Sequence, residues 1–392
     1  MSNPTLSVSG YPTPATLAAP VPAPPAVAAR LPEIDVIRGL SVLMMIVVHT
    51  LLYFATAKTQ LNGLGHVIMV LGKATATFVV CLGLSFSLSR RQALGAALRR
   101  GALLLAYGYA LNFVKFIMPL YLFHSLPAAF LLDMGLRPGD PANFPFLLLL
   151  GDILQMAGLS VMVLAGLRHW RVGPLPTLAL AALVALAAPL LWGLRPAQPV
   201  VAYFCDLLWG QTYTVFFPLF PWLAYALVGL ALGDAYRRFA AWPRLFHAWV
   251  GGGGLLGLAA GLLLGALYPA TWHGVDFYRT GPAGIFALSG LTGLVFSGLR
   301  VATPYLPGGL LRGLTFFSRH VTALYVISWV AIYWNLGWLG FLQYSHPWQL
   351  ALLVAYIMGL TLLVHGGYRW LRRRLATPGA GAVGHSQPAG RP

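Results

Sequence analysis

A histidine, His49, lies within the first long apolar stretch of the sequence, LPEIDVIRGLSVLMMIVVHTLLY at residues 31–53. The stretch begins with charged residues, which include Asp35 and Arg38. A helix rises about 1.5 Å per residue, so His49 would lie roughly 16 Å deeper along it than Arg38. Histidine is the commonest general base, and an ionisable residue near the middle of a membrane is a functional-site hypothesis by default. Asp35 precedes Arg38 by three residues, so it can orient the guanidinium group from the same helix face.

Further polar residues are predicted at membrane depth in other apolar runs: Lys73, Asn112, Asp152, Gln155, Arg319 and His320. Arg319 keeps its proton and therefore needs an anion, a dipole or water, for which a ligand phosphate is a natural candidate. Lys73 and Asp152 would either form a structural ion pair or belong to a site. Asn112 and Gln155 are explained more simply by hydrogen bonds between helices. Cations exceed acids in these runs, which favours an anionic ligand over a path for cations.

The composition identifies the chain as an integral membrane protein. Of its 392 residues, 58% are hydrophobic and 8% are charged, whereas a soluble domain carries about 25% charged residues. The net charge of +17 does not indicate nucleic acid, because no soluble basic stripe interleaves with aromatic residues. Cys81 and Cys205 lie in separate apolar stretches and predict neither a disulfide framework nor a metal site.

Apolar runs of about 20 residues, each long enough to span a bilayer, predict an all-α polytopic protein with about ten transmembrane helices. The runs are 36–56, 64–88, 99–122, 144–165, 174–194, 212–233, 246–268, 281–301, 311–334 and 348–369. Segment 199–211 is shorter and more polar, which indicates a re-entrant or interfacial piece. Residues 1–30 predict a disordered Pro/Ala-rich tail without a cleaved signal peptide. Residues 31–370 form the predicted membrane domain, and residues 371–392 a basic, then flexible, tail.

The arginines predict the orientation of the chain, because short cytoplasmic loops are enriched in Lys and Arg. Most of them fall in one alternating set of loops and termini, whereas the other set contains only Lys58, Lys115, Arg137, Arg195 and Arg279. Both termini are therefore predicted to be cytoplasmic. Gly251–Gly254 suits close helix contact, and glycine-rich faces would permit a homodimer.

The predicted outer loops 116–143 and 269–280 contain Trp, Tyr, His and Asp residues, including Asp276. Such residues line sugar sites, because rings stack on pyranose faces and carboxylates accept hydrogen bonds from hydroxyls. An aromatic belt at the membrane surface explains them more simply.

Several strings resemble the transmembrane acyltransferase superfamily, in particular its heparan-α-glucosaminide N-acetyltransferase-like branch, which is related to the acyltransferase-3 proteins. Residues 31–53 contain an Asp-x-x-Arg-Gly motif, here Asp35, Arg38 and Gly39, followed by His49. The other strings are FVVCLGLSFSLSRR (78–91), FLLLLGDILQMAGLS (146–160), FPLFPWLAYALVGLALGD (217–234) and SRHVTALYVISW (318–329). Together they cover most of residues 31–370. Arg38 matches an arginine of acyltransferase-3 proteins, where animal glucosaminide enzymes have asparagine.

The resemblance implies transfer of an acyl group, usually acetyl, from cytoplasmic acetyl-CoA to a sugar across the membrane. It implies that His49 is catalytic, with Arg38 and Asp35 beside it in the motif. A bacterial-type envelope glycan or lipid-linked sugar is an acceptor at least as well supported as heparan. The expected location is the inner cell membrane.

The resulting hypothesis places the CoA phosphates at the cytoplasmic arginines, with Arg90, Arg91, Arg312, Arg319 and His320 as candidates. Lys73 is the candidate for the donor's reacting end, where Lys73 or an amide such as Asn112 would stabilise an oxyanion. His49 would deprotonate the acceptor or carry the acyl group itself. The acceptor candidates are Asn112, Asp152, Gln155 and Asp276, and no metal is expected.

Two other functions compete with this hypothesis. A transporter or a lipid- or glycan-handling protein would use the polar residues as a binding site, although transporters commonly have paired repeats and the sequence shows none. A structural or regulatory partner of a glycan synthase would need no catalytic base.

Overall fold

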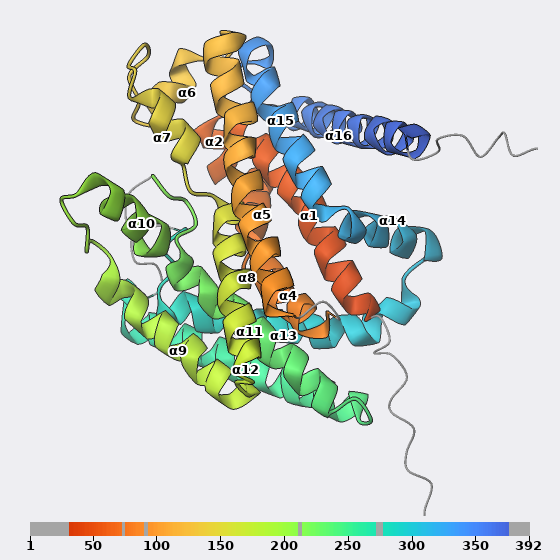
Figure 1. The fold of residues 1–392 in the computed structure, drawn as a ribbon. Helices are drawn as coiled ribbons and strands as arrows, with labels where there is room; N and C mark the ends of the chain where they lie inside the picture. The colour runs from red at the N-terminus through yellow and green to blue at the C-terminus, as the bar shows by residue number, and fades with distance from the viewer. Residues whose placement is uncertain (1–30, 73–74, 90–92, 211–213, 272–276, 376–392) are drawn as a thin grey trace, which may run out of the picture. The chain divides into compact units, whose positions relative to one another are not determined.

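The computed structural model describes residues 31–72, 75–89, 93–210, 214–271 and 277–375, and within these ranges every regular element is helical (Figure 1). The first half contains α1 (Pro32–Phe54), α2 (Ala57–Leu61), α3 (Gly63–Leu71), α4 (Thr75–Leu88), α5 (Leu94–Asn112), the π-helix η2 (Phe113–Leu122), α6 (Ala128–Asp133), α7 (Asn143–Leu149), α8 (Ile153–His169) and α9 (Pro174–Leu191). The second half contains α10 (Pro199–Trp209), α11 (Leu219–Arg238), α12 (Pro243–Leu267), η3 (Pro269–Thr271), α13 (Pro282–Ala302), η4 (Thr303–Tyr305), α14 (Gly308–Arg319), α15 (Val321–Leu339) and α16 (Pro347–Leu375). The predicted all-α class is confirmed.

Nine helical segments of the described chain are long and apolar enough to cross a membrane. They are Pro32–Phe54, Gly63–Leu88, Leu94–Leu122, Pro174–Leu191, Leu219–Arg238, Pro243–Leu267, Pro282–Tyr305, Val321–Leu339 and Pro347–Leu375. The protein is therefore a multi-pass membrane protein. Helix α8 is apolar but shorter than these nine, and it corresponds to the remaining predicted span. Helix α10 is also short, which agrees with the prediction that segment 199–211 does not cross the membrane.

The prediction of one continuous span over 144–165 is wrong. The chain forms α7, leaves the helical conformation at Leu150, and starts α8 after Asp152. Asp152 is the N-cap of α8 and forms a capping box with Gln155. A capping residue satisfies the amide groups that a helix start leaves unpaired, so the Asp-x-x-Gln sequence starts a helix here.

The prediction that residues 311–334 form one span is also wrong. Helix α14 ends at Arg319, His320 separates it from α15, and Arg312 and Arg319 are exposed. Helix α14 is amphipathic, because its two arginines are exposed whereas Leu314 is buried. Arg319 and His320 therefore lie at a helix junction and not inside a span.

Helix α1 contacts α14, α15 and α16, so that the first membrane helix and the last three elements form one group (Figure 1). Elsewhere α4 packs on α11, α5 on α8, and α12 on α13. Glycines permit the closest of these crossings: a Cβ added at Gly83 would lie 1.9 Å from the Ala226 carbonyl oxygen, and one at Gly229 1.9 Å from that of Val80. Small residues of this kind let membrane helices approach closely.

The predicted glycine contact at Gly251–Gly254 is present at its last residue. A Cβ added at Gly254 would lie 2.7 Å from the carbonyl oxygen of Gly290 on α13, whereas Gly252 and Gly253 face open space.

Candidate functional site

A buried ion pair lies beside the helix break after α7. The Lys115 Nζ atom is 2.9 Å from the Asp152 Oδ2 atom, and the Lys115 side chain is only 2% exposed. The ammonium group also lies 4.7 Å from the ring centroids of both Phe116 and Trp329. Carboxylate and aromatic faces together compensate the buried cation. The prediction that Lys115 belongs to an outer loop is wrong.

Lys115 reaches this position from η2, a run of π-helix that continues α5. A π-helix widens the backbone turn and shifts the side chains after it to a different face. Pro119 lies within η2, and a proline removes one backbone donor from the helical ladder. The local distortion therefore accompanies the inward placement of the lysine, as is frequent at functional sites.

Asp152 is fixed from several directions. Its backbone amide donates to Gln155 Oε1 at 3.1 Å, and its Oδ1 accepts from the Ile153 amide at 2.8 Å. The preceding residue, Gly151, pairs with the backbone of Thr214 and Phe216 at 3.0 and 2.8 Å. The carboxylate is consequently held at the break between α7 and α8.

Asn112 and Gln155 stabilise the same break. The Asn112 amide donates to the carbonyl oxygens of Leu148 and Leu150 at 3.0 and 2.7 Å, and Gln155 Nε2 donates to Leu150 at 3.3 Å. These contacts correspond to the interhelical hydrogen bonds that the sequence analysis weighed for both residues. The structure brings both side chains next to Asp152, through the backbone that precedes it.

His49 lies between the ion pair and an aromatic cluster. Its ring stacks on Trp329 with centroids 4.1 Å apart, and the Lys115 ammonium lies 4.7 Å from the centroid of the same Trp329 ring. The Nδ1 atom is buried and has no hydrogen-bond partner in the described chain, although the side chain as a whole remains partly exposed. Tyr325, one turn before Trp329, donates a hydrogen bond to Asp152 Oδ2 at 3.4 Å. A histidine, a lysine and a carboxylate thus share one site.

Aromatic rings continue from His49 along α1 and α15. The Tyr333 hydroxyl donates to the Tyr53 hydroxyl at 2.6 Å, and the Tyr53 ring lies 5.6 Å from the Trp329 ring. These residues belong to a core that also contains Phe54 and Phe130. His49 therefore sits in a largely apolar environment in which electrostatic interactions are stronger than in water.

A second group of charges lines a cavity of about 620 Å³ where the start of α15 meets the end of α16. We call it the basic cleft, and its charged and imidazole-bearing residues are Arg38, Arg319, His320, His365, Arg369, Arg372 and Arg373. No carboxylate is present among the described residues that line it. The His320 and His365 rings lie 4.7 Å apart, and both nitrogens of the buried His365 lack a hydrogen-bond partner in the described chain.

The structure separates Arg38 from His49, with the arginine at the basic cleft and the histidine beside the ion pair. Asp35 is buried and accepts a hydrogen bond from the Ser318 hydroxyl at 2.7 Å, which joins α1 to α14. Arg312 is exposed and does not appear among the residues that line the cleft. Lys73, Arg90, Arg91 and Asp276 fall outside the described residues.

A model of the catalytic region of heparan-alpha-glucosaminide N-acetyltransferase matches residues 30–252, which is more than half of the chain. The chain belongs to this family. The match confirms the resemblance drawn from the sequence and identifies the protein as a member of a membrane acetyltransferase family. No curated protein sequence matches the chain.

The region that matches the acetyltransferase family contains His49, Lys115 and Asp152, whereas Trp329 and the arginines of α16 lie beyond it. Within the described chain, groups of three or more metal-ligating side chains do not converge.

Sequence reasoning did not identify Lys115, Trp329 or the arginines of α16 as site residues. A signal existed for α16, because His365, Arg369 and Arg372 recur at helical spacing and so share a face. Trp329 and Tyr325 are likewise one turn apart. For Lys115 the signal was its position within an apolar run.

Proposed function

We propose that the chain transfers an acyl group, acetyl in the simplest case, from acyl-CoA to an amine or hydroxyl of a sugar. The observation that supports this proposal is the arrangement of His49 beside the Lys115–Asp152 pair, in a member of a membrane acetyltransferase family. The basic cleft supplies a separate region for a phosphate-bearing donor.

The basic cleft fits the phosphates of CoA. Guanidinium groups bind phosphate through paired charge-assisted hydrogen bonds, and five arginines line this cavity. His365 adds unpartnered nitrogens at its buried wall. Arg38 lies eleven residues before His49 on α1, a separation of roughly 16 Å. The long pantetheine arm of CoA would follow this helix from the cleft toward the histidine.

In the proposed reaction, the nitrogen or oxygen of the acceptor attacks the thioester carbonyl carbon while a ring nitrogen of His49 takes its proton. The carbon–sulfur bond then breaks, and the CoA thiolate leaves and takes up the proton as a thiol. Lys115 has three donors, of which one is directed to Asp152. Another would stabilise the oxygen anion that forms on the attacked carbonyl.

The orientation inferred from the arginines places the basic cleft on the cytoplasmic side, because Arg38, Arg369, Arg372 and Arg373 all belong to the predicted cytoplasmic set. The acceptor then approaches from the opposite side. An inner cell membrane is the location in keeping with an envelope glycan acceptor. The homodimer stays a prediction from the glycine-rich helices.

The test uses the purified full chain in phospholipid nanodiscs with acetyl-CoA and a panel of amino sugars and sugar alcohols, and it follows release of free thiol. A positioned general base contributes about 10²- to 10⁴-fold, so His49→Ala is expected to lose at least about 100-fold in rate. His66→Ala, an exposed histidine on α3, is the matched control. Unchanged thiol release by His49→Ala would contradict the catalytic assignment, and absence of CoA binding would favour a transporter.

A further inference from the structure

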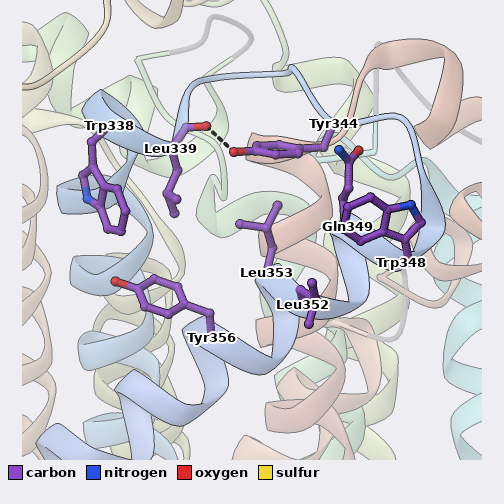
Figure 2. Close-up of a pocket in the computed structure, with 8 residues that line it drawn as sticks. All are labelled: Trp338, Leu339, Tyr344, Trp348, Gln349, Leu352, Leu353 and Tyr356. Atoms are coloured by element: carbon purple, nitrogen blue, oxygen red, sulfur yellow. Dashed lines mark hydrogen bonds between the residues drawn. The ribbon is translucent and has the colours of Figure 1, made fainter.

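A second cleft, shown in Figure 2, is lined by the end of α15 and the start of α16. The basic cleft lies at the opposite end of this helix pair. We call it the aromatic cleft, and its volume is about 320 Å³. Trp338 and Tyr356 form one side, Tyr344 and Trp348 form the other, and Leu352 and Leu353 lie between them. All the described residues that line it are uncharged.

The polar atoms of the two tyrosines are already used by the protein. The Tyr344 hydroxyl donates to the Leu339 carbonyl oxygen at 2.7 Å (Figure 2). The Tyr356 hydroxyl donates to Asn335 Oδ1 at 3.0 Å. The cleft therefore presents mainly ring faces and leucine side chains to an occupant, together with the Gln349 amide. A sugar ring would find few hydrogen-bond donors here, whereas a hydrocarbon chain needs none.

The cleft opens on side chains that the protein leaves uncovered. Trp338, Trp348 and Leu352 are 66%, 62% and 63% exposed. They lie on two helices that are long and apolar enough to cross a membrane, so the bilayer surrounds this opening. Trp348 lies at the start of α16, and tryptophan is enriched where a membrane helix meets the headgroups. An occupant would thus have its polar end near Trp348 and its chain along Leu352.

The aromatic cleft is connected to the helix that carries His49. After α15, the Leu342 amide donates to the Tyr53 carbonyl at 3.0 Å, and the Tyr344 amide donates to the Phe54 carbonyl at 2.9 Å. The Thr56 amide returns a hydrogen bond to Tyr344 at 2.9 Å. Phe54 is five residues beyond His49, a rise of roughly 7.5 Å. A molecule anchored in the cleft is therefore held beside the end of the helix that carries His49.

We infer that the aromatic cleft holds the hydrocarbon chain of a membrane-anchored acceptor and keeps the acceptor's polar head beside the end of the helix that carries His49. The role of the bound amphiphile as acceptor rests on the proposed function, whereas the binding of a hydrocarbon chain in the cleft does not. An acceptor that binds in this way is an amphiphile, with a saccharide head on an alkyl or isoprenoid chain. Donor phosphates and acceptor chain would then occupy opposite ends of the same two helices.

The binding test uses a dodecyl glycoside with a diazirine on its chain, photolysed with the full chain in phosphatidylcholine nanodiscs, followed by peptide mapping. Labelling is expected to concentrate in residues 338–356. Leu352→Trp fills the exposed opening without disturbing the core and should lower this labelling about tenfold, as overpacking of a site does. Leu363→Trp is the matched control, because Leu363 is a 73% exposed residue of the same helix outside the cleft.

Two results would overturn the inference. Equal labelling by a diazirine phospholipid at the same mole fraction would show that bulk lipid covers the cleft. Uniform labelling along the membrane helices would show that no chain site exists.

A second measurement separates this inference from the proposed function. Acetyl transfer to dodecyl and to free amino sugars is compared in the wild type, Leu352→Trp and Leu363→Trp. Preference for the anchored acceptor should fall about tenfold in Leu352→Trp alone. Transfer without any preference would overturn the cleft's role and leave the proposed function intact. Localised labelling without any transfer would overturn the proposed function and leave the chain site intact.

Discussion

The Lys115–Asp152 pair and the basic cleft both concentrate charge in an apolar protein, but they balance that charge differently. Lys115 is buried, and a carboxylate 2.9 Å away compensates it. The basic cleft gathers five arginines around a cavity, with no carboxylate among the described residues that line it. Buried charge must be compensated by the protein, whereas charge that lines an open cavity can also be stabilised by solvent. The contrast distinguishes a charge that a neighbouring carboxylate balances from a group of charges that lines a cavity.

The largest expected effect is the loss of folding stability when one charge of the buried Lys115–Asp152 pair is removed. Lys115→Met leaves the Asp152 carboxylate without its cation and should destabilise the folded protein by about 3–5 kcal/mol. The measurement is the thermal unfolding midpoint in detergent at fixed lipid content. The double variant Lys115→Met/Asp152→Leu removes both charges, so it should recover most of this stability while acyl transfer stays low. Equal stability of wild type and Lys115→Met would contradict the structural importance of the pair.

Neutralising the basic cleft should leave the fold intact and weaken donor binding. Arg369→Gln and Arg372→Gln remove the guanidinium groups of a partly exposed and an exposed residue. Each lost charge-assisted hydrogen bond should raise the acetyl-CoA KM about tenfold. The wild-type KM should also rise with salt, because exposed charges are screened. Steady-state kinetics from low to high salt test both expectations. An acetyl-CoA KM that is unchanged in both variants would show that the donor binds elsewhere.

A smaller effect is expected where a neutral group supports the buried pair. Tyr325→Phe removes the hydrogen bond to Asp152 and keeps the ring, so it should cost about 0.5–1.5 kcal/mol in unfolding free energy. The unfolding midpoint of this variant should therefore lie between those of the wild type and Lys115→Met. A loss as large as that of Lys115→Met would mean that the tyrosine, and not the ion pair, organises the site.

The smallest effect should come from an arginine near the cleft but not in it. Arg312 is exposed on α14 and does not line the cavity. Arg312→Gln should leave stability within about 0.5 kcal/mol of the wild type and should not change the acetyl-CoA KM. The same kinetic and unfolding measurements apply. A tenfold rise in KM would restore Arg312 as a phosphate ligand and weaken the distinction between cleft and surface.

The matched part of the chain adds a further contrast. The family match ends at residue 252, before α13 to α16, yet those last helices supply Trp329 beside His49 and most arginines of the basic cleft. The ion-pair residues come from the matched region, and the residues that surround them come partly from outside it. The packing of α1 against α14, α15 and α16 therefore brings residues of the matched region next to residues of the basic cleft.

Sequence reasoning was accurate where local composition decides structure. Apolar runs of sufficient length predicted the helical membrane fold, and the motif with His49 predicted the family. It failed at 144–165 and 311–334, where it expected unbroken spans. Hydropathy averages over a window and does not register that Asp152 and Gln155 cap a new helix, or that His320 separates α14 from α15.

The sequence by itself determined that the chain is a membrane protein, that it is helical, and that His49 lies within the first span. Those properties follow from hydrophobicity and helical rise, which act along the chain. Only the tertiary structure decided that Lys115 is the partner of Asp152, that Trp329 stacks on His49, and that α16 completes the basic cleft with Arg38. Each of these contacts joins residues far apart in sequence, so packing between helices sets them and no local pattern records them.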